Sequence, residues 1–176
     1  MVNWRARVGS ASANSGGVIH EIQNLIAHPN YSSFTFDSDI GILRTVRNIV
    51  FVNNAVQLAS LGGYFVTDNQ VVYAAGWGLT EAGSQSNELR HVQLMTINQQ
   101  TCQQRYGTPF ITSNMLCSGW LDVGGRDQCR GDDGGPLYHS GLVVGICSWG
   151  TGCALPYYPG VNTRVSNFIS WIRENA

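Results

Sequence analysis

Short strand-like segments separated by turns fill most of the chain, and they constrain its fold more than any other feature. A helical period appears only in the last dozen residues, where Val165, Phe168, Ile169 and Ile172 share one helical face and Ser166 is a candidate N-cap. Gly accounts for 21 of 176 residues, about 12% against a typical 7%, which suits a turn-rich chain. These features predict an all-β barrel or sandwich that ends in a helix.

The predicted strands are rich in β-branched and aromatic residues and are bounded by turn residues. They span residues 18–26, 40–45, 71–77, 89–97, 115–120 and 142–149. His139-Ser140-Gly141 predicts a hairpin turn between residues 136–138 and the strand that follows. One or two helical turns are predicted over residues 101–106, ending at Gly107.

Charge and hydropathy exclude several classes of protein. Charged residues are 12% of the chain, about half the usual share, and the net charge is -1. This balance provides no basic field for a phosphate backbone or an anionic lipid surface, so we expect neither nucleic acid nor membrane as a partner. No window approaches 18 consecutive apolar residues, which excludes a transmembrane helix.

The cationic residues are unusual because all ten are Arg and none is Lys. Lys loses its proton near pH 10, whereas Arg stays charged beyond about pH 12, so such a surface keeps its charge in strongly alkaline fluid. Drift in a short chain with few charges is the alternative interpretation.

The five cysteines lack the paired spacing of zinc sites and occur where loops could be cross-linked, as in secreted proteins. They are Cys102, Cys117, Cys129, Cys147 and Cys153. The first seven residues have neither the apolar core nor the cleavage site of a secretory signal. We therefore expect that an N-terminal portion of a secreted protein is missing from the chain.

The segment richest in chemical groups is Asp127-Gln-Cys-Arg-Gly-Asp-Asp-Gly-Gly-Pro136. It is followed by Ile146-Cys-Ser-Trp-Gly150 and Tyr158-Pro-Gly-Val-Asn162, and preceded by Arg7-Val-Gly-Ser, His28-Pro-Asn-Tyr, Asp39-Ile-Gly-Ile-Leu and Ala75-Gly-Trp-Gly. On these motifs the chain, from about Arg5 to Asn175, resembles the chymotrypsin-like (trypsin-type) serine endopeptidases. Among them it is most similar to the midgut trypsins of moth and butterfly larvae.

The resemblance implies an all-β architecture of two antiparallel six-stranded barrels with the active site between them. Residues 1–60 would form a partial first barrel, residues 61–70 a connection, and residues 71–176 the second barrel with the C-terminal helix. A monomer secreted into an alkaline gut lumen is also implied, which favours the alkaline interpretation of the Arg-only composition.

The resemblance also implies roles for individual residues. Asp39 corresponds to the triad acid, and Gly131 and the residue at 133 would supply oxyanion N–H groups. Asp127 would form the floor of a specificity pocket for Arg or Lys. Asp132 would pair with the amine released by zymogen cleavage.

The remaining implied roles concern the pocket walls and the cysteines. Gly150 and Gly160 would leave the pocket walls open, and Ser148, Trp149 and Gly150 would pair with the substrate backbone. The implied disulfides join Cys102 to Cys117 and Cys129 to Cys153. Cys147 is left over, and we interpret it as a small core residue rather than a reactive thiol.

The chain departs from the family pattern in three places. Asp133 stands where the family has the nucleophilic Ser. The segment ending Ala-Ala-His-Cys is absent, and His20, His28, His91 and His139 lie in other contexts. An Ile-Val-Gly-Gly start is absent as well, which leaves Asp132 without its amine.

An Asp at 133 is a poor nucleophile for a peptide bond. Its carboxylate would form an anhydride while expelling an unprotonated amine, with no base or acid to assist. We expect its side chain instead to accept hydrogen bonds from the N–H groups of the oxyanion turn. This leaves Asp132 short of a positive partner, which favours either its protonation or a loosened, zymogen-like turn.

We therefore predict a trypsin-like serine endopeptidase family member with a pocket for Arg or Lys, and we expect this chain to be catalytically inactive. Asp39 and Asp133 are the candidate catalytic residues, and peptides, proteins or inhibitors with Arg or Lys are the expected partners. No cofactor is predicted, and a metal site at Asp39, Asp132 and Asp133 lacks further ligands. The alternatives are a sequence variant of a true protease, a non-catalytic homologue that binds basic peptides or inhibitors, and a fragment completed by another chain along its open edges.

Overall fold

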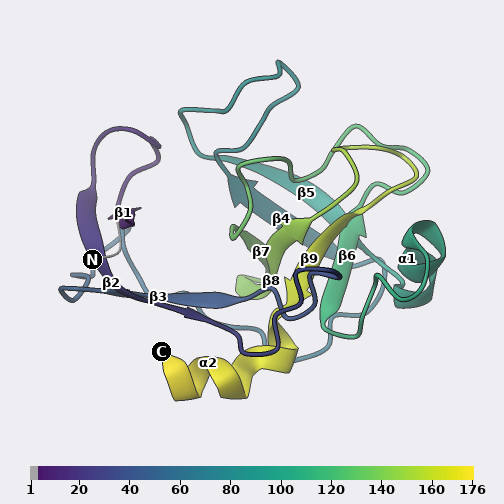
Figure 1. Ribbon diagram of the computed structural model, residues 1–176. Helices are drawn as coiled ribbons and strands as arrows, with labels where there is room; N and C mark the ends of the chain where they lie inside the picture. Colours follow the sequence, from purple (N-terminus) through teal and green to yellow (C-terminus); the bar gives the residue numbers. More distant parts are fainter. Residues whose placement is uncertain (1–3) are drawn as a thin grey trace.

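Extended segments dominate the computed structural model, which describes residues 4–176 (Figure 1). The strands are β1 (Arg5–Val8), β2 (Val18–Ala27), β3 (Gly41–Thr45), β4 (Val71–Gly76), β5 (Arg90–Ile97), β6 (Met115–Gly119), β7 (Pro136–His139), β8 (Leu142–Trp149) and β9 (Gly160–Arg164). The helices are α1 (Gln99–Tyr106), the 3-10 helix η1 (Val165–Phe168) and α2 (Ile169–Asn175). This arrangement confirms the predicted all-β class with a C-terminal helix. None of the helices described is long and apolar enough to cross a membrane.

Strands β4 to β9 form a closed antiparallel barrel in the order β4-β5-β6-β9-β8-β7. Side chains alternate between its interior and its surface, as the pleat of a strand requires. In β4, Val72 and Ala74 are buried, whereas Tyr73 between them is exposed. Val72 packs in the barrel core with Leu94 and Leu116 from other strands. The barrel is therefore a filled core that holds the loops at its rim.

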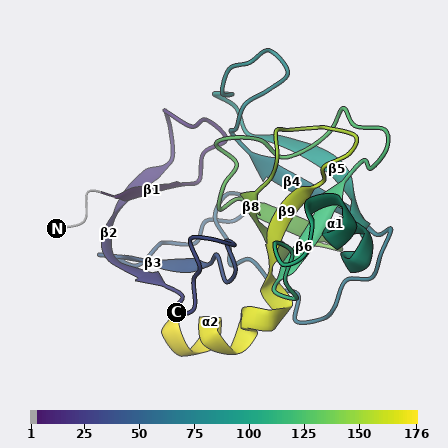
Figure 2. The same cartoon turned by 45° about the vertical axis from the view of Figure 1, so that its right-hand side comes forward.

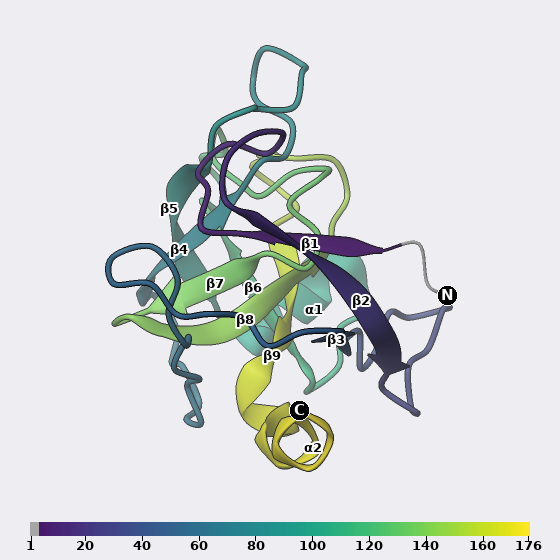
Figure 3. The same cartoon turned by 90° about the vertical axis from the view of Figure 1, so that its left-hand side faces the viewer.

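Strands β1, β2 and β3 form a separate antiparallel sheet in that order, beside the barrel (Figures 1 and 3). The end of this sheet is joined to the C-terminal helices by His28, whose ring lies 5.1 Å from that of Phe168 and 4.9 Å from that of Trp171. Arg44 of β3 also donates a 2.9 Å hydrogen bond to the carbonyl of Asn175, so α2 lies beside this sheet (Figure 2).

Most predicted elements occur within a residue or two of their expected bounds. The hairpin between β7 and β8 is confirmed, since Ser140 and Gly141 both have positive φ, 50° and 79°, between the paired residues His139 and Leu142. Strands β1 and β9 were not predicted. The Ser166 cap is wrong because the first turn is a 3-10 helix that begins after Arg164, with no side-chain cap hydrogen bond.

Candidate active site

A cavity of about 490 Å³ lies at the rim of the barrel, where the loop between β6 and β7 meets the end of β8 and the start of β9. Six residues expected in substrate binding or catalysis line it: Asp127, Asp133, Ser148, Trp149, Gly150 and Gly160. These residues come from three segments of the chain. The structure therefore brings the motif at the end of β8 and the motif at the start of β9 together with the aspartate-rich loop.

Asp127 is a largely buried carboxylate in this cavity. Its Oδ1 accepts a hydrogen bond from the N–H of Gln128 at 2.9 Å, and its Oδ2 accepts one from the N–H of Ala154 at 3.1 Å. Burial raises the pKa of Asp127 to about 6, although both backbone hydrogen bonds oppose that shift. Above that pH the cavity contains a negative charge with no salt bridge to any cation among residues 4–176. A guanidinium or ammonium group would supply the missing charge.

Two glycines keep the space around Asp127 open. A Cβ atom on Gly160 would lie 2.6 Å from Oδ1 of Asp127, closer than real contacts allow, so β9 must begin with glycine here. A Cβ on Gly150 would have no neighbour nearer than 3.8 Å. A larger side chain at Gly150 would therefore find room, and because Gly150 lines the cavity it would reduce the space for a ligand.

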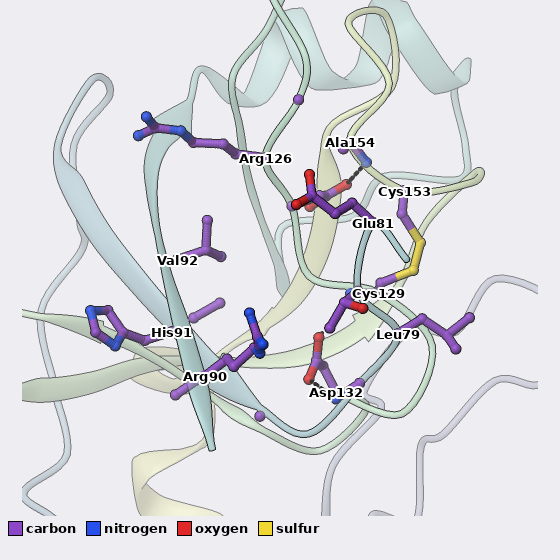
Figure 4. A pocket seen from close by; sticks show the side chains of 17 residues that line it. Leu79, Glu81, Arg90, His91, Val92, Arg126, Cys129, Asp132, Cys153 and Ala154 are labelled. Carbon is purple, nitrogen blue, oxygen red and sulfur yellow. Dashed lines mark hydrogen bonds between the residues drawn. A yellow bond between two sulfur atoms is a disulfide. The ribbon is translucent and has the colours of Figure 1, made fainter. Parts of the chain in front are cut away.

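A disulfide links the two segments that hold Asp127. Cys129 and Cys153 are bonded with an S–S distance of 2.06 Å (Figure 4). Cys153 directly precedes Ala154, whose N–H donates a hydrogen bond to Asp127. The second disulfide joins Cys102 in α1 to Cys117 in β6. Both are the pairs that the resemblance implies.

Cys147 is free and buried in the cavity wall, where its thiol donates to Oε1 of Gln128 at 3.4 Å. Burial raises the pKa of Cys147 to about 12, and the carboxylates of Asp132, Asp133 and Asp127 act in the same direction. A thiol with so high a pKa is a weak nucleophile, which fits a packing role.

Asp39 precedes β3 and reaches the barrel from the three-stranded sheet. Its Oδ2 accepts a 2.6 Å hydrogen bond from the hydroxyl of Ser148, which lines the cavity. Its carbonyl accepts another at 2.6 Å from the hydroxyl of Thr163 in β9. The contact between Asp39 and Ser148 spans 109 positions of the chain, and sequence reasoning did not predict it.

The adjacent aspartates of the glycine-rich turn have different partners. The N–H of Gly131 donates to Oδ2 of Asp133 at 3.2 Å, as expected. Asp132 instead points into a neighbouring cavity of about 470 Å³ (Figure 4). There its carboxylate accepts hydrogen bonds from the N–H of Gly78 at 2.8 Å and from the N–H of Cys129 at 3.0 Å. Asp132 forms no salt bridge in the described part of the chain, and these two donors hold its carboxylate. Protonation of Asp132 or a loosened turn stays a prediction.

The motif Ala75-Gly-Trp-Gly contributes to this arrangement in a way that sequence reasoning missed. A Cβ on Gly78 would lie 2.5 Å from the carboxyl carbon of Asp132, and one on Gly76 would also collide with that carboxylate. Both positions therefore need glycine to admit Asp132. The spacing of the two glycines was the signal that could have identified this contact.

The four imidazoles lie away from Asp133, and none lines its cavity. His28 packs against Phe168 and Trp171, and His139 contacts the hydroxyl of Tyr64. Within residues 4–176, no group of three or more His, Cys, Asp or Glu side chains is arranged to hold a metal ion.

Comparison with known proteins gives consistent matches over nearly the whole chain. The family model described as Trypsin matches residues 2–172. "Trypsin, alkaline A" of Manduca sexta is 58% identical over 178 aligned residues, which cover 98% of this chain and 69% of that protein. "Trypsin CFT-1" of Choristoneura fumiferana is 57% identical, with the same coverage of 98% and 69%. "Achelase-1" of Lonomia achelous is 46% identical, covering 99% of this chain and 77% of that protein.

Proposed function

Because the chain belongs to the trypsin family of proteolytic enzymes, we propose that it binds Arg and Lys side chains of peptides, proteins or inhibitors but does not cleave peptide bonds. One observation carries this proposal: the same cavity holds the partly buried carboxylate of Asp127 and, at the family's nucleophile position, Asp133. The first group attracts a cationic side chain, and the second cannot perform the acyl transfer of a serine.

The remaining site residues take their family roles in this proposal. Asp39 is the triad acid, and its hydrogen bond to Ser148 next to the cavity supports that role. Ser148, Trp149 and Gly150 pair with the substrate backbone, and Gly150 and Gly160 leave room for the side chain that enters. Asp132 is the acceptor of the activation amine, a role supported by its carboxylate facing a cavity (Figure 4).

Inactivity follows from the groups around position 133. Attack by Asp133 would form an anhydride and expel an unprotonated amine, and no imidazole lines its cavity to transfer the proton. The N–H of Gly131, a proposed oxyanion donor, already donates to the side chain of Asp133. The anionic side chain therefore competes with the developing oxyanion that this donor would stabilise.

We expect no release of the chromophore from an arginyl anilide at about pH 9, where Arg and the carboxylates keep their charges. Asp133→Ser alone should not restore turnover, because the proton still has no acceptor. Turnover that copurifies with the chain and disappears in Asp133→Ala would contradict the proposed inactivity.

The binding part of this proposal is favoured by the open cavity around Asp127, which has no cationic partner among residues 4–176. Benzamidine should bind, and Asp127→Asn should weaken its affinity by roughly 30-fold, the equivalent of about 2 kcal/mol for a buried charge pair. Calorimetric titration measures this, with Glu21→Gln in β2 as a control that removes the same charge outside the cavity. Equal affinities for the chain and Asp127→Asn would rule out the pocket.

The division of the chain and its location are also proposals. Residues 1–60 would be a partial first barrel, residues 61–70 a connection and residues 71–176 the second barrel with the C-terminal helix. Strands β1 to β3 fall in the first segment and β4 to β9 in the last, which supports this division, although residues 1–3 lie outside the described part. We propose secretion as a monomer into an alkaline gut lumen, of which the alkaline setting is supported by the Arg-only composition and by relatives named alkaline trypsins.

A further inference from the structure

We propose that the cavity of Asp127 and Asp133 selects small dications, with one cationic group at Asp127 and a second at Asp133. The inference rests on the proposed function, because it takes Asp127 as the site of the first cation. It goes further in assigning a ligand-binding role to Asp133, the residue that stands in place of the nucleophile. The class of ligand is an aliphatic chain with a guanidinium or ammonium group at each end.

The two carboxylates lie at different depths of one cavity. Asp127 is largely buried and both of its oxygens accept backbone N–H groups, whereas Asp133 is exposed. Both lie close enough to Cys147, which is itself in the cavity wall, for their charges to raise the pKa of its thiol. A ligand that enters toward Asp127 therefore passes a second negative group at the opening.

Asp133 has capacity left for a cation. Its Oδ2 accepts the 3.2 Å hydrogen bond from Gly131, and its Oδ1 accepts none from the described residues. Arg130 also lines the cavity, but the salt bridge found within residues 4–176 joins Arg105 to Asp122 instead. Both carboxylates thus lack a cationic partner while sharing one cavity.

The nature of the second cation follows from the exposure of Asp133. An ion pair at an exposed carboxylate is weak and is screened by salt, so the second group adds selectivity to binding that Asp127 dominates. An Arg inside a peptide chain offers one cation. An Arg with a free α-amino group, or a guanidinoalkylamine, offers two, and we expect this class to bind more tightly.

Agmatine and pentylguanidine form a matched pair of probes, because the terminal ammonium of the first is replaced by a methyl group in the second. We expect agmatine to bind this chain roughly twofold to fivefold more tightly at low ionic strength. The advantage should shrink toward onefold at about 0.5 M salt. Calorimetric titration of both ligands measures the ratio directly.

The variant Asp133→Asn tests whether that residue is the source of the advantage. It keeps the shape and an acceptor for the N–H of Gly131, so the agmatine preference should disappear while benzamidine binding persists. Asp133→Ser provides a second variant if the first does not fold. In Glu21→Gln, which loses a charge outside the cavity, the preference should remain.

The outcomes separate this inference from the proposed function. Equal affinities of the folded chain for agmatine and pentylguanidine, with benzamidine still bound, would overturn the dication site alone. A preference for agmatine that survives in Asp133→Asn would also overturn it. If none of the three ligands binds to the folded chain, the Asp127 pocket itself is refuted.

Discussion

Lowering the pH from about 7.5 to about 4 should weaken benzamidine binding roughly 20-fold, because Asp127 takes up a proton in that interval. Burial raises the pKa of this carboxyl from its ordinary value of 3.8 to about 6. Once protonated it cannot pair with the amidinium, so the affinity should fall below the pKa and level off near that of Asp127→Asn, roughly 30-fold lower. Titrations at a series of pH values measure the midpoint, which should lie near 6.

The same raised pKa predicts the opposite trend for the stability of the free chain. Between pH 3.8 and about 6 the folded state binds more protons at Asp127 than the unfolded state does. The contribution of this group to the free energy of unfolding therefore falls as pH rises through that window, and stays low above it. In Asp127→Asn the affinity for benzamidine should no longer depend on pH near pH 6. The fall in the free energy of unfolding between pH 3.8 and about 6 should also be absent. An unchanged pH profile in that variant would assign the titration to another group.

Removing the Cys129–Cys153 disulfide should abolish benzamidine binding and lower the free energy of unfolding by about 3 kcal/mol. The bridge closes a loop between residues 24 positions apart, and it joins the segment of Asp127 to that of Ala154. Without this disulfide, the segment of Ala154 is no longer held beside Asp127, and the hydrogen bond from the N–H of Ala154 to the carboxylate of Asp127 is weakened. Denaturant unfolding and calorimetric titration of the Cys129→Ala/Cys153→Ala variant measure the two effects.

The other disulfide is the matched control. Cys102 and Cys117 are 15 positions apart, so replacing both by Ala should cost a similar amount of stability, about 3 kcal/mol. Neither residue lines the cavity, and benzamidine binding should persist in the folded fraction. If the two double variants lose binding equally, the Cys129–Cys153 bridge has no specific role in the pocket.

Strands with an alternating pattern were predictable from the sequence, whereas a strand with polar buried residues was not. In β4 the buried and exposed positions alternate, and that pattern is visible in the residue types. All five residues of β9 are buried, including Asn162, Thr163 and Arg164. Asn162 donates to the carbonyl of Leu116 at 3.0 Å, and Arg164 to that of Met115 at 2.8 Å. Such partners exist only after the barrel has closed, so no local pattern could indicate this strand.

In the site, too, residues that are adjacent in the sequence were predictable, whereas contacts between residues far apart in the sequence were not. The motif around Asp127 was recognisable because its residues are adjacent in the sequence. The partners of Asp132 and Asp39 were not, since Gly78 lies 54 positions from Asp132 and Ser148 lies 109 positions from Asp39. The N–H donor from Gly78 could not be predicted for this reason, because it reaches Asp132 only in the folded barrel.

The three-stranded sheet has two edge strands, β1 and β3, each of which pairs only with β2 among the strands described. Unpaired edges invite extended segments of other molecules, and charged side chains on an edge discourage such self-association. Arg5 and Arg7 lie on β1, and Arg44 lies on β3. Two copies that approach edge to edge would therefore meet like charges. Because these cations are guanidinium groups, the repulsion persists at alkaline pH where ammonium groups would have become neutral, and the arginines act there as gatekeepers against aggregation.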